Sequence, residues 1–236
     1  LASSREILLR THRDREMLTQ TFNLPKGARL VSVQTGMSDP HRGGSSVAIL
    51  TFATDSANQM SIVYKPRDLR IDAAYHKLVA DVSATTPAVE PLRSLIVLPL
   101  DGYGYVEFVA HEICSNDNEL TDFYRNAGRL AAILYILGCN DCHNENVVAH
   151  RSQLLLVDAE TLLQGAPRGA IADTAEATAR GSLEARLGDS VMRIGLLPHW
   201  FFVAGERVPR DVSALGTEPP PSEHEAELPP LPRLGQ

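Results

Sequence analysis

The stretch Asp141-Cys142-His143-Asn144-Glu145-Asn146, followed closely by Asp158-Ala159-Glu160, decides how the rest of the chain is interpreted. It comes directly after a long segment, Leu120 to Leu137, whose apolar residues recur at helical spacing. Charged and polar side chains rarely enter a buried region without partners. The sequence therefore predicts a buried helix that ends at Gly138, followed by a loop with a chemical role.

The groups in this loop are those that phosphoryl transfer requires. That chemistry needs a carboxylate near the attacking hydroxyl, oxygen ligands for magnesium, and a cation on the nucleotide phosphates. Asp141 can supply the carboxylate, while Asn146 and Asp158 offer the hard oxygen ligands that Mg²⁺ prefers. We therefore predict Asp141 as the catalytic carboxylate and Asn146 and Asp158 as metal ligands.

A lysine upstream completes the set. Lys65 ends a predicted strand from Ser61, and a turn-rich loop with Gly43 and Gly44 opens the hairpin to which this strand belongs. A kinase places its phosphate-pairing lysine on such a strand, after a glycine loop. The order of parts predicts an α+β, two-lobed kinase-like fold, in which a small antiparallel sheet forms one lobe and a helical lobe carries the catalytic loop.

The other elements follow from periodicity and turn signals. We expect helices over residues 3 to about 20, Leu69–Val82 and residues 172 to 193, with a loose stretch between the first helix and Ser46. We expect strands over Val47–Phe52, Ser94–Pro99 and Tyr103–Val109, the last two joined by a turn at Asp101-Gly102. Two short strands are expected over Val147–Ala149 and Leu154–Val157. From Glu218 the tail is rich in proline and glutamate, which is typical of flexible or extended chain.

The same loop also contains Cys139-Asn140-Asp141-Cys142-His143, which fits the C-x-x-C-H pattern of c-type haem attachment. That attachment requires export, and the chain starts with no signal peptide. A zinc site or a redox C-x-x-C is also disfavoured, because no second Cys or His pair stands at ligand spacing. We therefore expect two buried thiols that pack the loop.

Bulk properties narrow the class of protein. The chain has 236 residues, 44% of them apolar, a net charge of -7 and a pI near 5.6. This acidic balance argues against a nucleic-acid binder, and no apolar segment has the length of a membrane span. Three cysteines without an export signal indicate reduced thiols in the cytoplasm. Because the chain lacks an initiator Met, we interpret it as a fragment of a longer protein.

Several blocks together resemble the dehydratase domain of class II lanthipeptide synthetases, the LanM type. They are Ser38 to Gly44, Val63-Tyr64-Lys65-Pro66-Arg67, Gly104 to Phe108, Asp141 to Asn146, Asp158-Ala159-Glu160-Thr161 and Asp211 to Gly216. The resemblance covers residues from about 30 to 216. It implies a partial dehydratase domain over residues 1–216 and a Pro-rich flexible tail over residues 217–236.

The resemblance implies a two-step dehydration that uses ATP and Mg²⁺. Ser or Thr of a ribosomally made precursor peptide is phosphorylated, and the phosphate is then eliminated to leave dehydroalanine or dehydrobutyrine. The expected partners are this peptide and the missing remainder of the dehydratase and cyclase domains. Carried over by position, the catalytic residues are Asp141, His143, Asp39, His41 and Glu160, the nucleotide-binding residues are Lys65, Arg67, Gly43 and Gly44, and the metal ligands are Asn146 and Asp158.

Two alternatives stay open at this point. A kinase-like enzyme that phosphorylates a lipid or a small molecule would carry the same loop. An inactive remnant that binds only a peptide would also fit, although the presence of Lys65, Asp141, Asn146 and Asp158 argues against decay of the site.

Overall fold

The structure is a computed structural model that describes residues 2–36, 46–54, 59–85, 90–163, 190–198, 200–201, 210–211 and 213–216. The chain divides into two compact units, Leu1–Val109 and Ala110–Gln236.

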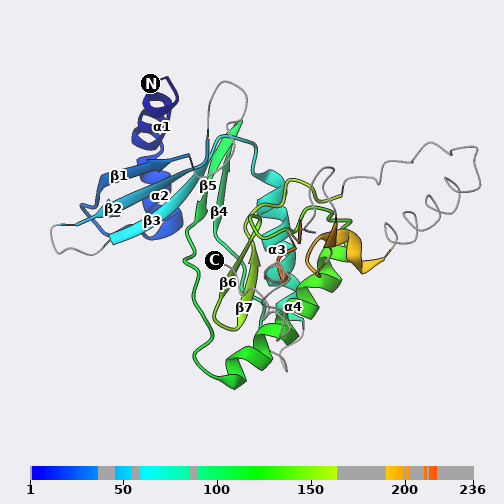
Figure 1. The fold of residues 1–236 in the computed structure, drawn as a ribbon. Helices are drawn as coiled ribbons and strands as arrows, with labels where there is room; N and C mark the ends of the chain where they lie inside the picture. The colour runs from blue at the N-terminus through cyan, green and yellow to red at the C-terminus, as the bar shows by residue number, and fades with distance from the viewer. Residues whose placement is uncertain are drawn as a thin grey trace, which may run out of the picture. The chain divides into compact units, whose positions relative to one another are not determined.

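Unit 1 is built on a five-stranded antiparallel sheet (Figure 1). Its strands are β1 (Arg29–Thr35), β2 (Ala48–Ala53), β3 (Gln59–Lys65), β4 (Val97–Leu100) and β5 (Tyr103–Glu107), in the order β1-β2-β3-β5-β4. Alternate residues of β2 are buried, so one face of the sheet carries the core. The predicted α+β class and antiparallel sheet are confirmed.

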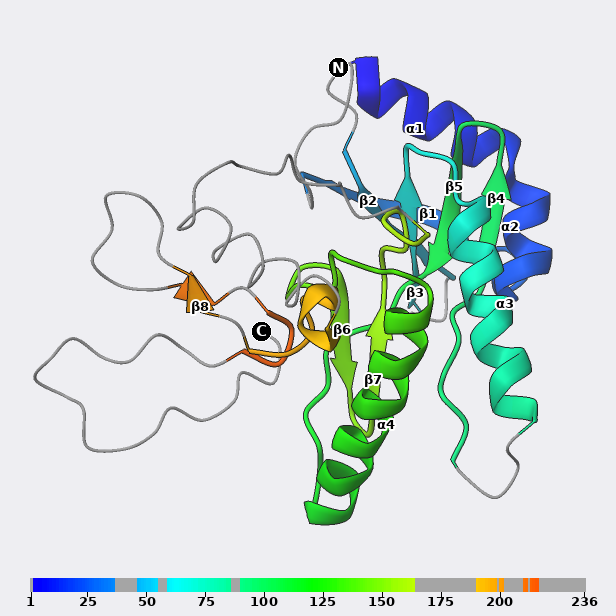
Figure 2. The ribbon, with the colours of Figure 1, turned by 90° about the vertical axis from the view of Figure 1, so that its right-hand side faces the viewer.

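Two helices, α1 (Ala2–Arg13) and α2 (Arg15–Phe22), cover that core face. Ile7, Leu18 and Phe22 pack there with buried residues of the strands, among them Phe52 and Tyr64. The chain changes direction between the two helices (Figure 2). The helical stretch expected over residues 3 to about 20 is therefore confirmed, except that it is broken at Asp14 into two helices.

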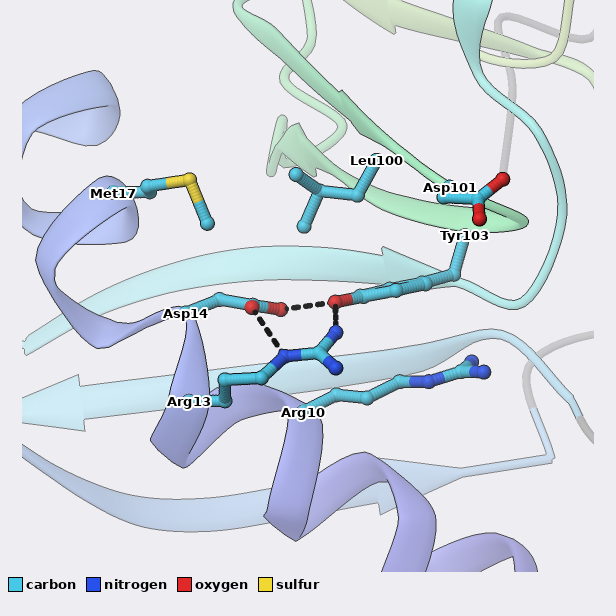
Figure 3. Close-up of a pocket in the computed structure, with 7 residues that line it drawn as sticks. All are labelled: Arg10, Arg13, Asp14, Met17, Leu100, Asp101 and Tyr103. Atoms are coloured by element: carbon cyan, nitrogen blue, oxygen red, sulfur yellow. Dashed lines mark hydrogen bonds and ion pairs between the residues drawn. The ribbon is translucent and has the colours of Figure 1, made fainter.

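Asp14 accounts for the break between α1 and α2. Its carboxylate is almost fully buried and accepts hydrogen bonds from the hydroxyls of Tyr103, at 2.6 Å, and Tyr105, at 3.0 Å. Arg13 contacts both Asp14 and the Tyr103 hydroxyl (Figure 3). The hydrogen bonds that Asp14 accepts from these two tyrosines of β5 offset the interruption of the helix.

The opposite face of the sheet carries Lys65. Side chains alternate along a strand, so Lys65 points away from the core that holds its neighbour Tyr64. Lys65 is nevertheless only 5% exposed. Helix α3 (Arg70–Ala84) belongs to this unit and contacts β4, and its buried side chains include Asp72 and His76.

Unit 2 contains one long helix, α4 (Asp117–Ile136), and the hairpin β6 (Val147–His150) and β7 (Gln153–Leu156). The hairpin lies beside α4 (Figures 1 and 2), with direct contacts between α4 and β7. A 3₁₀ turn, η1 (Val191–Ile194), also contacts α4, and β8 (Trp200–Phe201) pairs with β9 (Arg210–Asp211). The predicted helix, loop and hairpin thus follow one another as expected.

Some expectations differ from the structure or fall outside it. Strand β1 occupies part of the stretch expected to be loose, and the end of the helix expected over 172 to 193 is the 3₁₀ turn η1. Residues 172–189 and the tail 217–236 lie outside the described residues. None of the described helices is long and apolar enough to cross a membrane.

Candidate active site

The catalytic loop, residues 139 to 146, is anchored by the end of α4. Asn116 caps the start of this helix by accepting from the backbone of Asn118 and Glu119, and Leu130 and Leu134 lie on its buried face. At the other end, Gly138 takes a positive φ of 68°, which glycine adopts without strain. The Cys139 amide then bonds to the Leu134 carbonyl at 3.0 Å. The loop therefore begins at a fixed point.

Three predicted residues, Asp141, His143 and Asn146, meet within the loop. The Asn146 amide nitrogen donates to the Asp141 carbonyl at 2.8 Å and to its carboxylate Oδ2 at 3.1 Å. His143 Nε2 lies 3.3 Å from the other carboxylate oxygen, Oδ1. Since both oxygens of Asp141 have a neighbour that can donate, the carboxylate is held in one orientation.

The tautomer of His143 follows from its second contact. Its Nδ1 accepts a hydrogen bond from the Glu145 amide at 3.2 Å. In a neutral imidazole the other nitrogen then carries the proton, so Nε2–H faces Asp141. His143 can therefore donate to the carboxylate without being charged.

The hairpin brings Asp158 to the loop. Asn146 immediately precedes β6, and its carbonyl accepts from the Val157 amide, which follows β7, at 2.8 Å. Asp158 is the next residue, and its Oδ1 accepts from the Glu160 amide at 3.1 Å. The two predicted metal ligands therefore come from adjacent points at one end of the hairpin, and Glu160 is exposed beside them.

The donor set fits a magnesium ion. Two acceptors on Asp141 fix the nitrogen of the Asn146 amide, which leaves its oxygen as the atom available to a cation. Mg²⁺ binds such amide and carboxylate oxygens and keeps several waters or phosphate oxygens. Within the described part of the chain, no group of three His, Cys, Asp or Glu side chains could by itself hold a metal. The ion would therefore depend on phosphate ligands as well as on Asn146 and Asp158.

In unit 1, Lys65 and Arg67 lie close together at and just beyond the end of β3. Arg67 forms a two-pronged ion pair with Asp72 of α3, at 2.7 and 3.0 Å between nitrogen and oxygen atoms. Asp72 is 1% exposed. Such a forked pair fixes the plane of the guanidinium.

His76, one turn of α3 beyond Asp72, lies in the same charged surroundings. Burial is the largest cause that lowers the pKa of His76, to about 4, with a smaller lowering by Lys65 and opposing effects of Asp72 and Glu107. Its Nδ1 accepts from the Leu95 amide at 3.2 Å. His76 is therefore a neutral, structural group near neutral pH.

Asp72 and His76 were not expected from the sequence. Both lie among the buried residues of α3. Their polar side chains stand between apolar residues in the sequence, and no motif marks them as functional. Only the three-dimensional structure shows that Asp72 is buried and pairs with Arg67. Of the other predicted residues, Asp39, His41, Gly43 and Gly44 lie outside the described residues.

A pocket beside Asp14 is lined by other residues, including Arg10, Arg13, Met17 and Tyr103 (Figure 3). No residue predicted for the site lines it. Arg10 and Arg13 there contact Tyr64 and Tyr103 and the carboxylates of Glu6 and Asp14. The pocket therefore belongs to the packing of α1 and α2.

Comparison with known proteins now places the chain in a family. A family model described as a domain of unknown function, DUF4135, matches residues 1–231. The chain belongs to the DUF4135 family. This DUF4135 chain also resembles one curated protein, the lacticin 481/lactococcin biosynthesis protein LcnDR2 of Lactococcus lactis subsp. lactis. The two are 24% identical over 175 residues, which are 71% of this chain and 18% of the relative.

The likeness to LcnDR2 confirms the resemblance to lanthipeptide synthetases, and the DUF4135 chain spans less than a fifth of that relative. Among solved structures, it resembles the complete CtTel1 dimer with C2 symmetry, at a TM-score of 0.37 and 16% identity over 57% of this chain and 8% of the other. It also resembles the FAT and kinase domain of CtTel1, at 0.36 and 17% over 57% and 14%.

Proposed function

We propose that the chain phosphorylates Ser and Thr of a lanthipeptide precursor with ATP and Mg²⁺, as the first step of their dehydration. The observation that carries this proposal is the Asp141 carboxylate, held by His143 and Asn146 on the loop behind α4. The relationship to a lacticin 481 biosynthesis protein supports a peptide as the substrate.

The roles of the loop residues follow from their contacts. Asp141 accepts the proton of the Ser or Thr hydroxyl while the hydroxyl oxygen bonds to the γ-phosphorus, and ADP leaves. His143 and Asn146 keep the carboxylate pointing in one direction, which lowers the cost of reorganisation during transfer. When bound, Mg²⁺ supplies charge stabilisation to the phosphates, and Asn146 and Asp158 would hold it.

The resemblance assigns nucleotide binding to two cations of unit 1, Lys65 and Arg67. Lys65 pairs with nucleotide phosphates, and Arg67, whose guanidinium is held in one plane by Asp72, is assigned to the same group. The second step removes a weakly acidic Cα proton while phosphate leaves, so it requires a base and cationic stabilisation. We assign part of that step to Asp39 and His41, and the rest to the remainder of the dehydratase domain.

Co-expression with a precursor peptide tests the proposal, with mass spectrometry of the peptide as the measurement. We expect a gain of phosphate on Ser or Thr that is lost in Asp141→Asn. Asp122→Asn, on the exposed side of α4, is the matched control and should keep the activity. Loss of water from the peptide would show that elimination also occurs.

Other outcomes identify the alternatives. Phosphorylation of a lipid or a small molecule, but never of the peptide, would overturn the proposal in favour of a different kinase-like enzyme. Peptide binding in calorimetry without any nucleotide binding would indicate an inactive remnant.

A further inference from the structure

The catalytic loop contains two thiols three residues apart, Cys139 and Cys142. Both side chains are 0% exposed and neither forms a disulfide in this structure. A side-chain hydrogen bond joins the two sulfurs. The pair is therefore more than the loop packing expected from the sequence, because the two buried thiols interact with each other.

The backbones of both cysteines are anchored. The Cys139 amide bonds to Leu134 at the end of α4, and the Cys142 amide bonds to the Ile194 carbonyl of η1 at 2.8 Å. Cys139 Sγ also lies 3.7 Å from the Thr161 hydroxyl, just beyond Glu160. Contacts with Leu134, Ile194 and Thr161 thus hold the two cysteines from three different parts of unit 2.

We propose that Cys139 and Cys142 form a redox site that closes reversibly to a disulfide, and that closure displaces Asp141. A disulfide requires the sulfurs to approach to about 2 Å. Since the backbones at both ends are held, the contraction falls on the two residues between them, Asn140 and Asp141. The effect on catalysis rests on the proposed function, whereas disulfide formation does not.

Hydrogen peroxide is an oxidant small enough for this buried pair. The Cys139 thiolate attacks one peroxide oxygen, the O–O bond breaks, and the hydroxide that leaves takes a proton to become water, leaving a sulfenic acid. The Cys142 sulfur then attacks the Cys139 sulfur, the S–O bond breaks, and the departing hydroxide combines with the Cys142 proton. The sum is two thiols and one peroxide giving a disulfide and two waters, and a dithiol reverses it.

The electrostatic surroundings support Cys139 as the attacking sulfur. The hydrogen bond from Cys142 is the largest cause that lowers the pKa of Cys139, and the same bond raises the pKa of Cys142. Cys114, by contrast, has its pKa raised chiefly by burial, and its thiol donates to the Arg151 carbonyl at 3.3 Å. Cys114 therefore serves as an internal control for unspecific oxidation.

The test treats the full chain with hydrogen peroxide, alkylates remaining thiols with N-ethylmaleimide and maps the peptides by mass spectrometry. We expect a Cys139–Cys142 disulfide with Cys114 still alkylated, and recovery of both thiols with dithiothreitol. The proposal is overturned if Cys139 and Cys142 are recovered in alkylated form, and so were still thiols after the peroxide treatment, while Cys114 is oxidised.

Displacement of Asp141 has its own readout. Hydrogen exchange of the amides from residue 140 to 146 should change several-fold on oxidation, and not at all in Cys142→Ala, with Cys114→Ser as the matched control that behaves like the wild type. An unchanged loop in the oxidised protein would contradict the proposal.

Peptide phosphorylation should be lost on oxidation and return on reduction. If the untreated protein does not phosphorylate the peptide, the proposed function is refuted, whereas the result on the disulfide is unaffected.

Discussion

Asp72 shows how much one buried carboxylate contributes to unit 1. Removing one partner of a buried ion pair leaves the other charge without compensation, at a cost of about 3–5 kcal/mol. We expect Asp72→Ala to lower the free energy of unfolding by about 3 kcal/mol, because Arg67 is only 15% exposed. Urea denaturation measures this change.

A matched control lies on the same helix. Asp81 pairs with Lys77 on the exposed side of α3. Asp81→Ala should cost no more than about 0.5 kcal/mol, because exposed pairs four residues apart contribute little. Equal losses in the two variants would contradict the buried role of Asp72.

His76 predicts a pH dependence. Its pKa is about 4 in the folded protein against 6.5 in the unfolded chain, so the unfolded state binds more protons between these values. Stability should therefore be intact above pH 6.5 and fall as the pH drops towards 4, by about 3 kcal/mol in total. His76→Asn keeps an acceptor for the Leu95 amide and removes the titration.

Urea denaturation of wild type and His76→Asn at pH 7, 5.5 and 4 measures this effect. The difference between the two proteins should shrink or reverse as the pH falls. Parallel curves over the whole range would show that His76 does not titrate between the folded and unfolded states.

The sequence alone predicted the contacts between site residues that are close along the chain. Asp141, His143 and Asn146 lie within one loop, so their spacing already predicts that they meet. Asp72 and His76 owe their importance to the packing of α3 in unit 1, which no local spacing encodes.

Gly104 illustrates a constraint between elements. It stands opposite Lys65 in the β3–β5 ladder, and an added Cβ would meet the Leu98 carbonyl at 2.6 Å and Leu69 Cδ1 at 2.7 Å. Because one of these neighbours is backbone, the strand pair would have to shift. We expect Gly104→Ala to destabilise the protein by about 1–3 kcal/mol, measured by thermal or urea denaturation.

Gly128 offers the opposite case. It lies within α4, and nothing stands within 4 Å of an added Cβ. Gly128→Ala should leave stability unchanged or raise it by up to about 1 kcal/mol, since alanine is the better helix former. A loss in Gly128→Ala as large as that in Gly104→Ala would refute the steric argument.

Elements with a strong period were predictable and those without were not. Helix α4 and the strands β2 and β3 have clear apolar patterns, whereas β1 has no buried residue and so no alternation to detect. The break between α1 and α2 was missed because the apolar pattern continues through it, and Asp14 reveals its partners only in three dimensions.

Unit 1 contains a core of its own. Its twelve-member cluster of buried residues joins α1 and α2 to the sheet, from Ile7 to Tyr105, and the contacts that form it lie within residues 1–109. We expect residues 1–109 expressed alone to unfold cooperatively in urea with retained secondary structure by circular dichroism. A broad, gradual transition would show that this unit does not fold independently.

For the molecule as a whole, the order of elements predicted the α+β class and the family resemblance predicted the relationship to lanthipeptide biosynthesis proteins. The positions of Asp39 and His41, which the proposal assigns to elimination, lie outside the described residues. The contacts of the catalytic loop therefore support phosphorylation, whereas elimination is implied by the family resemblance.

The Asp14 network has a practical consequence for anyone shortening this protein. Without α1 and α2, the apolar core face of the sheet that these helices cover would be exposed to water, and the hydroxyls of Tyr103 and Tyr105 would lose their shared acceptor, Asp14. The tyrosines stand on β5, the strand paired with the one that ends at Lys65. Recombinant versions that begin at the sheet are therefore expected to express poorly, although they would retain every residue of the candidate site in unit 1.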